Sequence, residues 1–151
     1  MENSVDDMYH GCNDKKKEDL VKSQYPEELE MGTYANTWKK AETCATKKFE
    51  MRSKEDKSLT KHHMRAICVY TSNDVYSTFT EAVREQGKEY GTKEFQFHIL
   101  HFLLTSAIQI LNPSDNCQYT YRRTKVKYSG DVNQKIRFGT FASSSLKIFN
   151  L

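Results

Sequence analysis

The stretch that decides the fold is Lys93–Leu111, which reads KEFQFHILHFLLTSAIQIL. Its apolar residues recur at intervals of three and four, as on one face of an α-helix, and further apolar residues widen that face. A face this broad is typical of a helix buried inside a domain. We predict that the helix ends at Asn112-Pro113, because proline disfavours helical geometry at the residue before it.

The residues before this helix are also predicted to be mainly helical, because good helix formers and helical spacing of apolar residues dominate them. The apolar run from His63 is short enough to be a buried strand or a helix, and we favour the helix. Lys47–His63 is rich in charge and poor in apolar residues, so we expect an exposed connection there. The predicted helices are residues 14–23, 34–50, 63–70, and a segment capped by Ser72 or Asn73 that continues to Glu85.

After Pro113 the pattern changes from helical spacing to alternation. Gln118–Tyr128 alternates and is rich in Tyr, Thr and Val, which predicts a strand. Ser129-Gly130-Asp131 predicts a turn, and Ile136–Ile148 a second strand. Helices followed by strands indicate an α+β fold in a single domain, residues 1–151, with helices over 1–112 and a β core over 117–148. Two strands alone leave unpaired edges, so we expect this sheet to be incomplete.

Composition and charge exclude several classes of protein. The chain has 151 residues with 23 basic and 20 acidic side chains, a net charge of +3, which is too small to predict nucleic-acid binding. We expect no transmembrane segment, because no apolar run approaches about 20 residues. Cysteine spacing lacks a Cys-x-x-Cys pair, so we predict no metal site. Glycine-rich phosphate motifs are absent, which disfavours a conventional dehydrogenase or kinase.

Two motifs in the predicted strands carry candidate binding groups. Tyr121-Arg122-Arg123-Thr124 places one guanidinium on each side of a strand, where it could bind a phosphate or carboxylate or could simply be a solvated edge arginine. Ser143-Ser144-Ser145 offers small hydroxyl groups, which could position a ligand or could mark a polar strand end. No order of Ser, His and Asp makes any of these serines a nucleophile.

Histidines and the single tryptophan are interpreted as structural. His98 and His101 are three residues apart on the predicted helix, but no third metal ligand accompanies them, so we expect both to be packed. His62 and His63 lie in a charged stretch and are expected to be exposed. Trp38 follows Tyr34 at helical spacing and is predicted to belong to the core.

Several stretches, taken in order, resemble one family. The chain is similar to the vertebrate ecto-type arginine-specific mono-ADP-ribosyltransferases from about Val5 to Leu146, and residues 47–62 are the least similar part. The 21-residue step from Arg122 to Ser143 makes the combination specific. The matching stretches are Val5-Asp6-Asp7-Met8-Tyr9 with Gly11-Cys12, Phe97–Leu111, Tyr121-Arg122-Arg123-Thr124, and Ile136-Arg137-Phe138-Gly139 with Phe141-Ala142-Ser143-Ser144-Ser145-Leu146.

The resemblance implies an activity and roles for particular residues. Enzymes of this family transfer ADP-ribose from NAD, their substrate, to an arginine side chain of a target protein at the cell surface or outside the cell. It implies that Arg122 orients NAD and that Ser143 positions its nicotinamide end. Ser144 and Ser145 match neighbouring positions of the NAD-binding motif. No metal is implied.

The resemblance also leads to expectations about what this sequence lacks. The family's catalytic Glu-X-Glu loop would follow the last residue, so we expect negligible transferase activity, and we expect the family's signal peptide to be missing before Val5. Cys12 and Cys117 match family cysteines whose partners would lie further on, and Cys44 and Cys68 match none, so the sequence leaves open whether any two of the four cysteines form a replacement disulfide. The alternative function is a non-catalytic module that binds an anionic partner through Arg122, Arg123, Lys125 and Lys127.

Overall fold

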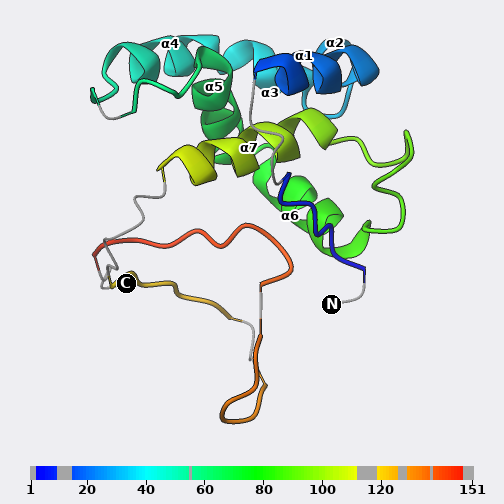
Figure 1. The fold of residues 1–151 in the computed structure, drawn as a ribbon, viewed down its shortest axis with the longest axis vertical. Helices are drawn as coiled ribbons and strands as arrows, with labels where there is room; N and C mark the ends of the chain where they lie inside the picture. Colours follow the sequence, from blue (N-terminus) through cyan, green and yellow to red (C-terminus); the bar gives the residue numbers. More distant parts are fainter. Residues whose placement is uncertain are drawn as a thin grey trace.

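The structure is a computed structural model that describes residues 3–9, 15–54, 56–111, 119–125, 129–136 and 138–147. Seven helices lie within these ranges (Figure 1). Figure 1 shows the described segments 119–125, 129–136 and 138–147, coloured gold to red, on the side of α7 that faces away from α4. The helices are α1 (Lys15–Gln24), α2 (Glu27–Glu30), α3 (Ala35–Lys40), α4 (Glu42–Glu50), α5 (Lys61–Tyr70), α6 (Tyr76–Glu85) and α7 (His98–Leu111).

The predicted α+β class is wrong, because the described part of the chain forms no sheet. The described residues of the predicted strands Gln118–Tyr128 and Ile136–Ile148 form a single antiparallel bridge, between Tyr121 and Ser145, instead of two strands. All the described residues in 119–125 and 129–136 are exposed, so their alternating side chains bury no common face. A hairpin without further partners is marginal in water, which explains why alternation alone did not produce strands.

Most helix predictions are confirmed, with changes at the ends. α1 and α5 match the predicted helices, but the predicted helix over 34–50 is divided at Ala41 into α3 and α4. The exposed connection predicted at Lys47–His63 begins after Glu50 and not at Lys47, since α4 continues to Glu50. Ser72 and Asn73 do not cap α6, whose N-cap is Val75; the Ser72 hydroxyl instead donates to the Val69 carbonyl and closes α5.

α7 begins five residues later than its apolar pattern predicts. Phe95 and Phe97 are buried, at 1% and 5% exposure, but lie in the segment before the helix. The backbone N–H groups of His98 and Ile99 donate to the carboxylate of Glu28, at 3.0 and 3.1 Å. An acidic group at a helix N-terminus satisfies these free donors and interacts favourably with the helix dipole. Glu28, from α2, therefore marks the start of α7.

The core lies where α5, α6 and α7 meet, with α3 on one side. Trp38 is buried as predicted. The N-terminal segment joins this core: the Val5 N–H donates to the Val83 carbonyl at 2.7 Å. A Cβ at Gly87 would lie 2.7 Å from the carbonyl oxygens of both Asn3 and Ser4, so only glycine permits this approach. The largest fully buried side chains include Tyr34, Phe79, Phe95, Phe102, Leu59, Ile99, Leu100 and Leu103.

A disulfide between Cys44 and Cys68 joins α4 to α5. These are the two cysteines that match no family position, and Cys12 and Cys117 lie outside the described residues. The bond closes a segment with a sequence separation of 24, and a loop of this length restricts the unfolded chain considerably. It therefore stabilises the pairing of α4 with α5.

Reduction of this disulfide is expected to lower the free energy of unfolding by about 3 kcal/mol. Urea unfolding followed by circular dichroism, with and without dithiothreitol, measures the change. The Cys44→Ala/Cys68→Ala variant is the control, because its unfolding midpoint should not respond to the reductant. An unaltered chain whose midpoint is the same in both conditions would contradict the expectation.

Candidate functional site

Arg122 and Ser143 lie together at the bridge between the two C-terminal segments. The Arg122 Nη1 donates to the Ser143 carbonyl oxygen at 2.7 Å. The adjacent bridge has two backbone hydrogen bonds, from the Tyr121 N–H to the Ser145 carbonyl at 2.7 Å and from the Ser145 N–H to the Tyr121 carbonyl at 2.9 Å. The structure thus brings Arg122 and Ser143, which the sequence analysis proposed as site residues, into direct contact.

Tyr70, the last residue of α5, connects this pair to the helical core. Its hydroxyl lies 2.8 Å from the Ser143 Oγ and donates to the Phe141 carbonyl at 3.3 Å. The Phe141 ring packs against the rings of Tyr70, Phe79 and His101. Burial raises the pKa of Tyr70, so its phenol remains protonated at neutral pH and can donate.

The other predicted serines occupy different environments. Ser144 is exposed beside Ser143, and Ser145 is half-buried with both backbone groups in the bridge. The Ser145 Oγ accepts from the Lys147 N–H at 3.1 Å. A guanidinium beside exposed hydroxyls suits an anionic, hydroxyl-bearing ligand, because the guanidinium pairs with phosphate oxygens and the hydroxyls with ribose or amide groups.

A cavity of about 350 Å³ reaches the residue before Ser143. One wall is the N-terminal segment, a second is α7, and a third is the segment Phe138–Ala142. The wall on α7 includes His101, Thr105, Ile108 and Gln109. α7 and the N-terminal segment therefore line the same cavity as the segment that leads into Ser143.

A chain of polar groups, half-buried except for the buried His101, lies behind that segment. The Tyr90 hydroxyl donates to the Asp7 carboxylate at 3.1 Å, the Tyr9 hydroxyl contacts the Tyr90 hydroxyl, and the His101 Nδ1 lies 2.9 Å from the Tyr9 hydroxyl. Since the Tyr90 proton goes to Asp7, Tyr9 donates to Tyr90 and the His101 Nδ1–H donates to Tyr9. Burial lowers the pKa of His101 to about 4 and raises those of Tyr9 and Tyr90. The His101 ring and the phenols of Tyr9 and Tyr90 are therefore uncharged at pH 7.

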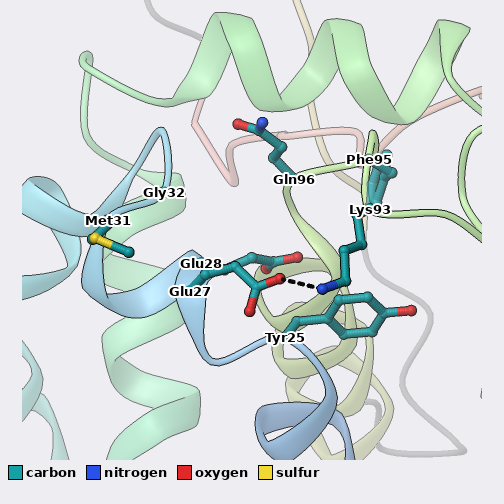
Figure 2. A pocket seen from close by; sticks show the side chains of 8 residues that line it. All are labelled: Tyr25, Glu27, Glu28, Met31, Gly32, Lys93, Phe95 and Gln96. Atoms are coloured by element: carbon teal, nitrogen blue, oxygen red, sulfur yellow. Dashed lines mark ion pairs between the residues drawn. The ribbon is translucent and has the colours of Figure 1, made fainter.

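A second cluster surrounds Glu28, next to a smaller cavity of about 190 Å³ (Figure 2). The Glu28 carboxylate contacts the His98 Nδ1 at 2.7 Å and accepts from the Tyr34 hydroxyl at 3.0 Å. Figure 2 shows Lys93 reaching toward Glu27, with 3.7 Å between the charged atoms. Because Glu28 is occupied by partners within the protein, we interpret this cluster as structural.

The histidine predictions are partly confirmed. His98 and His101 are buried and packed as expected. His62 is exposed as predicted, but His63 is buried and forms a capping box with Thr60 at the start of α5. Burial lowers the pKa of His63. In the described ranges, no three His, Cys, Asp or Glu residues are grouped as a metal site would require, and no helix is long and apolar enough to span a bilayer.

Sequence reasoning missed the residues that support the Arg122–Ser143 pair. No role at this pair was predicted for Tyr70 or Phe141, although Tyr70 ends the apolar run from His63 and Phe141 lies two residues before Ser143. A phenol at the last turn of a helix carries a polar tip that usually finds a partner, and that signal could have singled out Tyr70. Its partner in a segment 73 residues away could not be read from local pattern.

Comparison with known proteins decides the family. The family model for NAD:arginine ADP-ribosyltransferases matches residues 1–149. The chain belongs to this family. It is 33% identical over 155 residues to Ecto-ADP-ribosyltransferase 4 of Homo sapiens, covering 95% of this chain and 48% of that protein. It is 33% identical over 156 residues to T-cell ecto-ADP-ribosyltransferase 2 of Mus musculus, covering 95% and 48%.

A third relative, NAD(P)(+)--arginine ADP-ribosyltransferase 1 of Gallus gallus, is 28% identical over 149 residues, covering 96% of this chain and 48% of the relative. The chain thus spans about half the length of the curated ADP-ribosyltransferases it matches. No solved structure matches the chain. The relatives from human and mouse are named as ecto-enzymes.

Proposed function

We propose that the protein binds NAD for the reaction of its family, the transfer of ADP-ribose to arginine side chains of target proteins, and that Arg122 and Ser143 hold the NAD. The observation that supports this most directly is the contact between the Arg122 guanidinium and the Ser143 carbonyl, at 2.7 Å. This contact joins the guanidinium to the backbone of Ser143, and both residues are exposed. Membership of the NAD:arginine ADP-ribosyltransferase family supplies the class of reaction.

The proposed roles follow from the chemistry of the two side chains. Arg122 would pair with the pyrophosphate of NAD through parallel N–H donors, and Ser143 would bond to the ribose or amide at the nicotinamide end. Ser144 and Ser145 flank this position, and the bridge to Tyr121 fixes the backbone of Ser145. These residues would bind and orient NAD before the bond between nicotinamide and ribose breaks.

Breaking that bond leaves positive charge on the ribose, which a carboxylate would stabilise. In the printed sequence, Asp131 is the sole acidic residue after position 117, and it is exposed at the turn with Gln134. We therefore propose that these 151 residues bind NAD without measurable transfer of their own. Labelled NAD with agmatine as the acceptor would test this, and transfer lost in Arg122→Ala would contradict it.

The disulfide supports a proposed location outside the cell. Disulfides persist in oxidising compartments and are rare where glutathione keeps thiols reduced. The Cys44–Cys68 bond fits the first environment. The target would then be an arginine-bearing protein at the cell surface or in the extracellular medium.

Replacing Arg122 with alanine is expected to weaken NAD binding about 10- to 100-fold, because a charged hydrogen-bond donor contributes roughly 1.5–3 kcal/mol. Isothermal titration calorimetry of NAD into the 151-residue chain measures the change. Arg123→Ala is the matched control, since the neighbouring exposed arginine should affect NAD binding much less. Equal losses in both variants would contradict the assignment.

The alternative function is a non-catalytic module that binds an anionic partner. Binding of a polyanion that weakens steeply with salt, in a chain that does not bind NAD, would favour this alternative.

A further inference from the structure

The hydroxyl of Tyr70 is positioned to orient the hydroxyl of Ser143. It lies between two groups of the same segment, the Ser143 Oγ at 2.8 Å and the Phe141 carbonyl at 3.3 Å. The Arg122 guanidinium holds the same residue through a different group, the Ser143 carbonyl. Ser143 is thus fixed by one bond to its side chain and one to its backbone, from two different parts of the chain.

The number of protons limits how these bonds can be arranged. Tyr70 has one hydroxyl proton, and a carbonyl oxygen can only accept. When Tyr70 donates to the Phe141 carbonyl, the Ser143 hydroxyl must donate its proton to the Tyr70 oxygen. When Tyr70 donates to the Ser143 Oγ instead, the Ser143 proton is free for a ligand. Rotation of one hydroxyl therefore changes Ser143 from an engaged donor to an available one.

We propose that Tyr70 is a positioning residue of the NAD site, which orients the Ser143 hydroxyl and leaves it free to donate to NAD. This rests on the proposed function of Arg122 and Ser143. NAD would accept from Ser143 while Tyr70 donates to the Ser143 Oγ. Tyr70 touches no reacting atom in this arrangement and acts only through Ser143.

The packing of Tyr70 allows the role of its hydroxyl to be tested separately from that of its ring. The ring lies 5.4 Å from that of Tyr76 and 6.0 Å from those of Phe79 and Phe141, measured between centroids. Phenylalanine at this position keeps these aromatic contacts and removes only the hydroxyl. Tyr70→Phe should therefore fold, and any change it causes reports on the hydrogen bonds.

The test compares the NAD affinity of the unaltered 151-residue chain with that of four variants by isothermal titration calorimetry. Tyr70→Phe is expected to weaken NAD binding roughly 3- to 10-fold. Tyr70→Phe/Ser143→Ala is expected to bind no more weakly than Ser143→Ala alone, because Tyr70 acts through Ser143. Tyr25→Phe removes a phenol hydroxyl from the cavity of Figure 2 and should leave affinity unchanged. Equal affinity of Tyr70→Phe and the unaltered chain would overturn the proposal, as would additive losses in the double variant.

A second readout does not depend on NAD. Amide hydrogen exchange at Ser145, whose N–H donates to the Tyr121 carbonyl at 2.9 Å, should become several-fold faster in Tyr70→Phe as Ser143 loses its anchor. If the unaltered chain binds no NAD, the proposed function fails. The positioning of Ser143 by Tyr70 is then judged on exchange alone, and an unchanged rate at Ser145 overturns it.

Discussion

Replacing Glu28 with alanine is expected to lower the free energy of unfolding by about 3–5 kcal/mol, because it removes the acceptor shared by several buried donors. The carboxylate accepts from the backbone N–H groups of His98 and Ile99 and from the Tyr34 hydroxyl, and it contacts the His98 ring at 2.7 Å. Glu28 is 4% exposed, so water cannot replace it without opening the core. The start of α7 would lose its cap.

The measurement is urea unfolding at pH 7, followed by circular dichroism. Glu27→Ala is the matched control: Glu27 is the preceding residue of α2, but its carboxylate is partly exposed and, among the residues that the structure describes, pairs only with Lys93, at 3.7 Å. Exposed ion pairs of this kind contribute little, so the control should change the free energy of unfolding by well under about 1 kcal/mol. Similar losses in the two variants would show that Glu28 does not organise α7.

Replacing Phe79 with alanine is expected to cost about 3–5 kcal/mol, the usual range for removing a fully buried phenylalanine. Phe79 is 0% exposed and lies on α6, where its ring contacts those of Tyr70, Phe97 and Phe141. Loss of the ring removes apolar burial and leaves a cavity beneath Phe141, two residues before Ser143. Stability and the order of the site should therefore decline together.

Thermal and urea unfolding of Phe79→Ala, with Phe79→Leu as the control, would measure this effect. Leucine retains most of the buried volume and should cost less than about 1.5 kcal/mol. The amide of Ser145 should exchange faster in the alanine variant than in the leucine variant. A loss below about 1 kcal/mol in Phe79→Ala would contradict the placement of Phe79 at the centre of the core.

The sequence predicts the helices well where their apolar residues face one core. α5 and α7 follow the apolar pattern, because burial of that face is what stabilises them. The start of α7 could not be predicted, since its cap comes from Glu28, which is 70 residues away. The two strands were wrongly predicted because alternation shows that a segment can form a strand but does not supply a partner for it.

The site could be predicted only in part. Resemblance to a family singled out Arg122 and Ser143, and the structure places the two in contact. The residues that hold this pair could not be found in the same way. Tyr70 and Phe141 reach Ser143 through the packing of α5 and α6, which depends on the tertiary fold. Local pattern contains no information about contacts of that kind.

The most direct test of the proposed NAD site is to locate NAD on the chain by nuclear magnetic resonance. Adding NAD to the ¹⁵N-labelled 151-residue chain should shift the amide signals of Tyr121, Arg122, Ser143 and Ser145, and leave Met31 and Gly32 at the cavity of Figure 2 unchanged. Shifts centred on that cavity, or no shifts at NAD concentrations of several millimolar, would contradict the assignment of Arg122 and Ser143 as the residues that hold NAD.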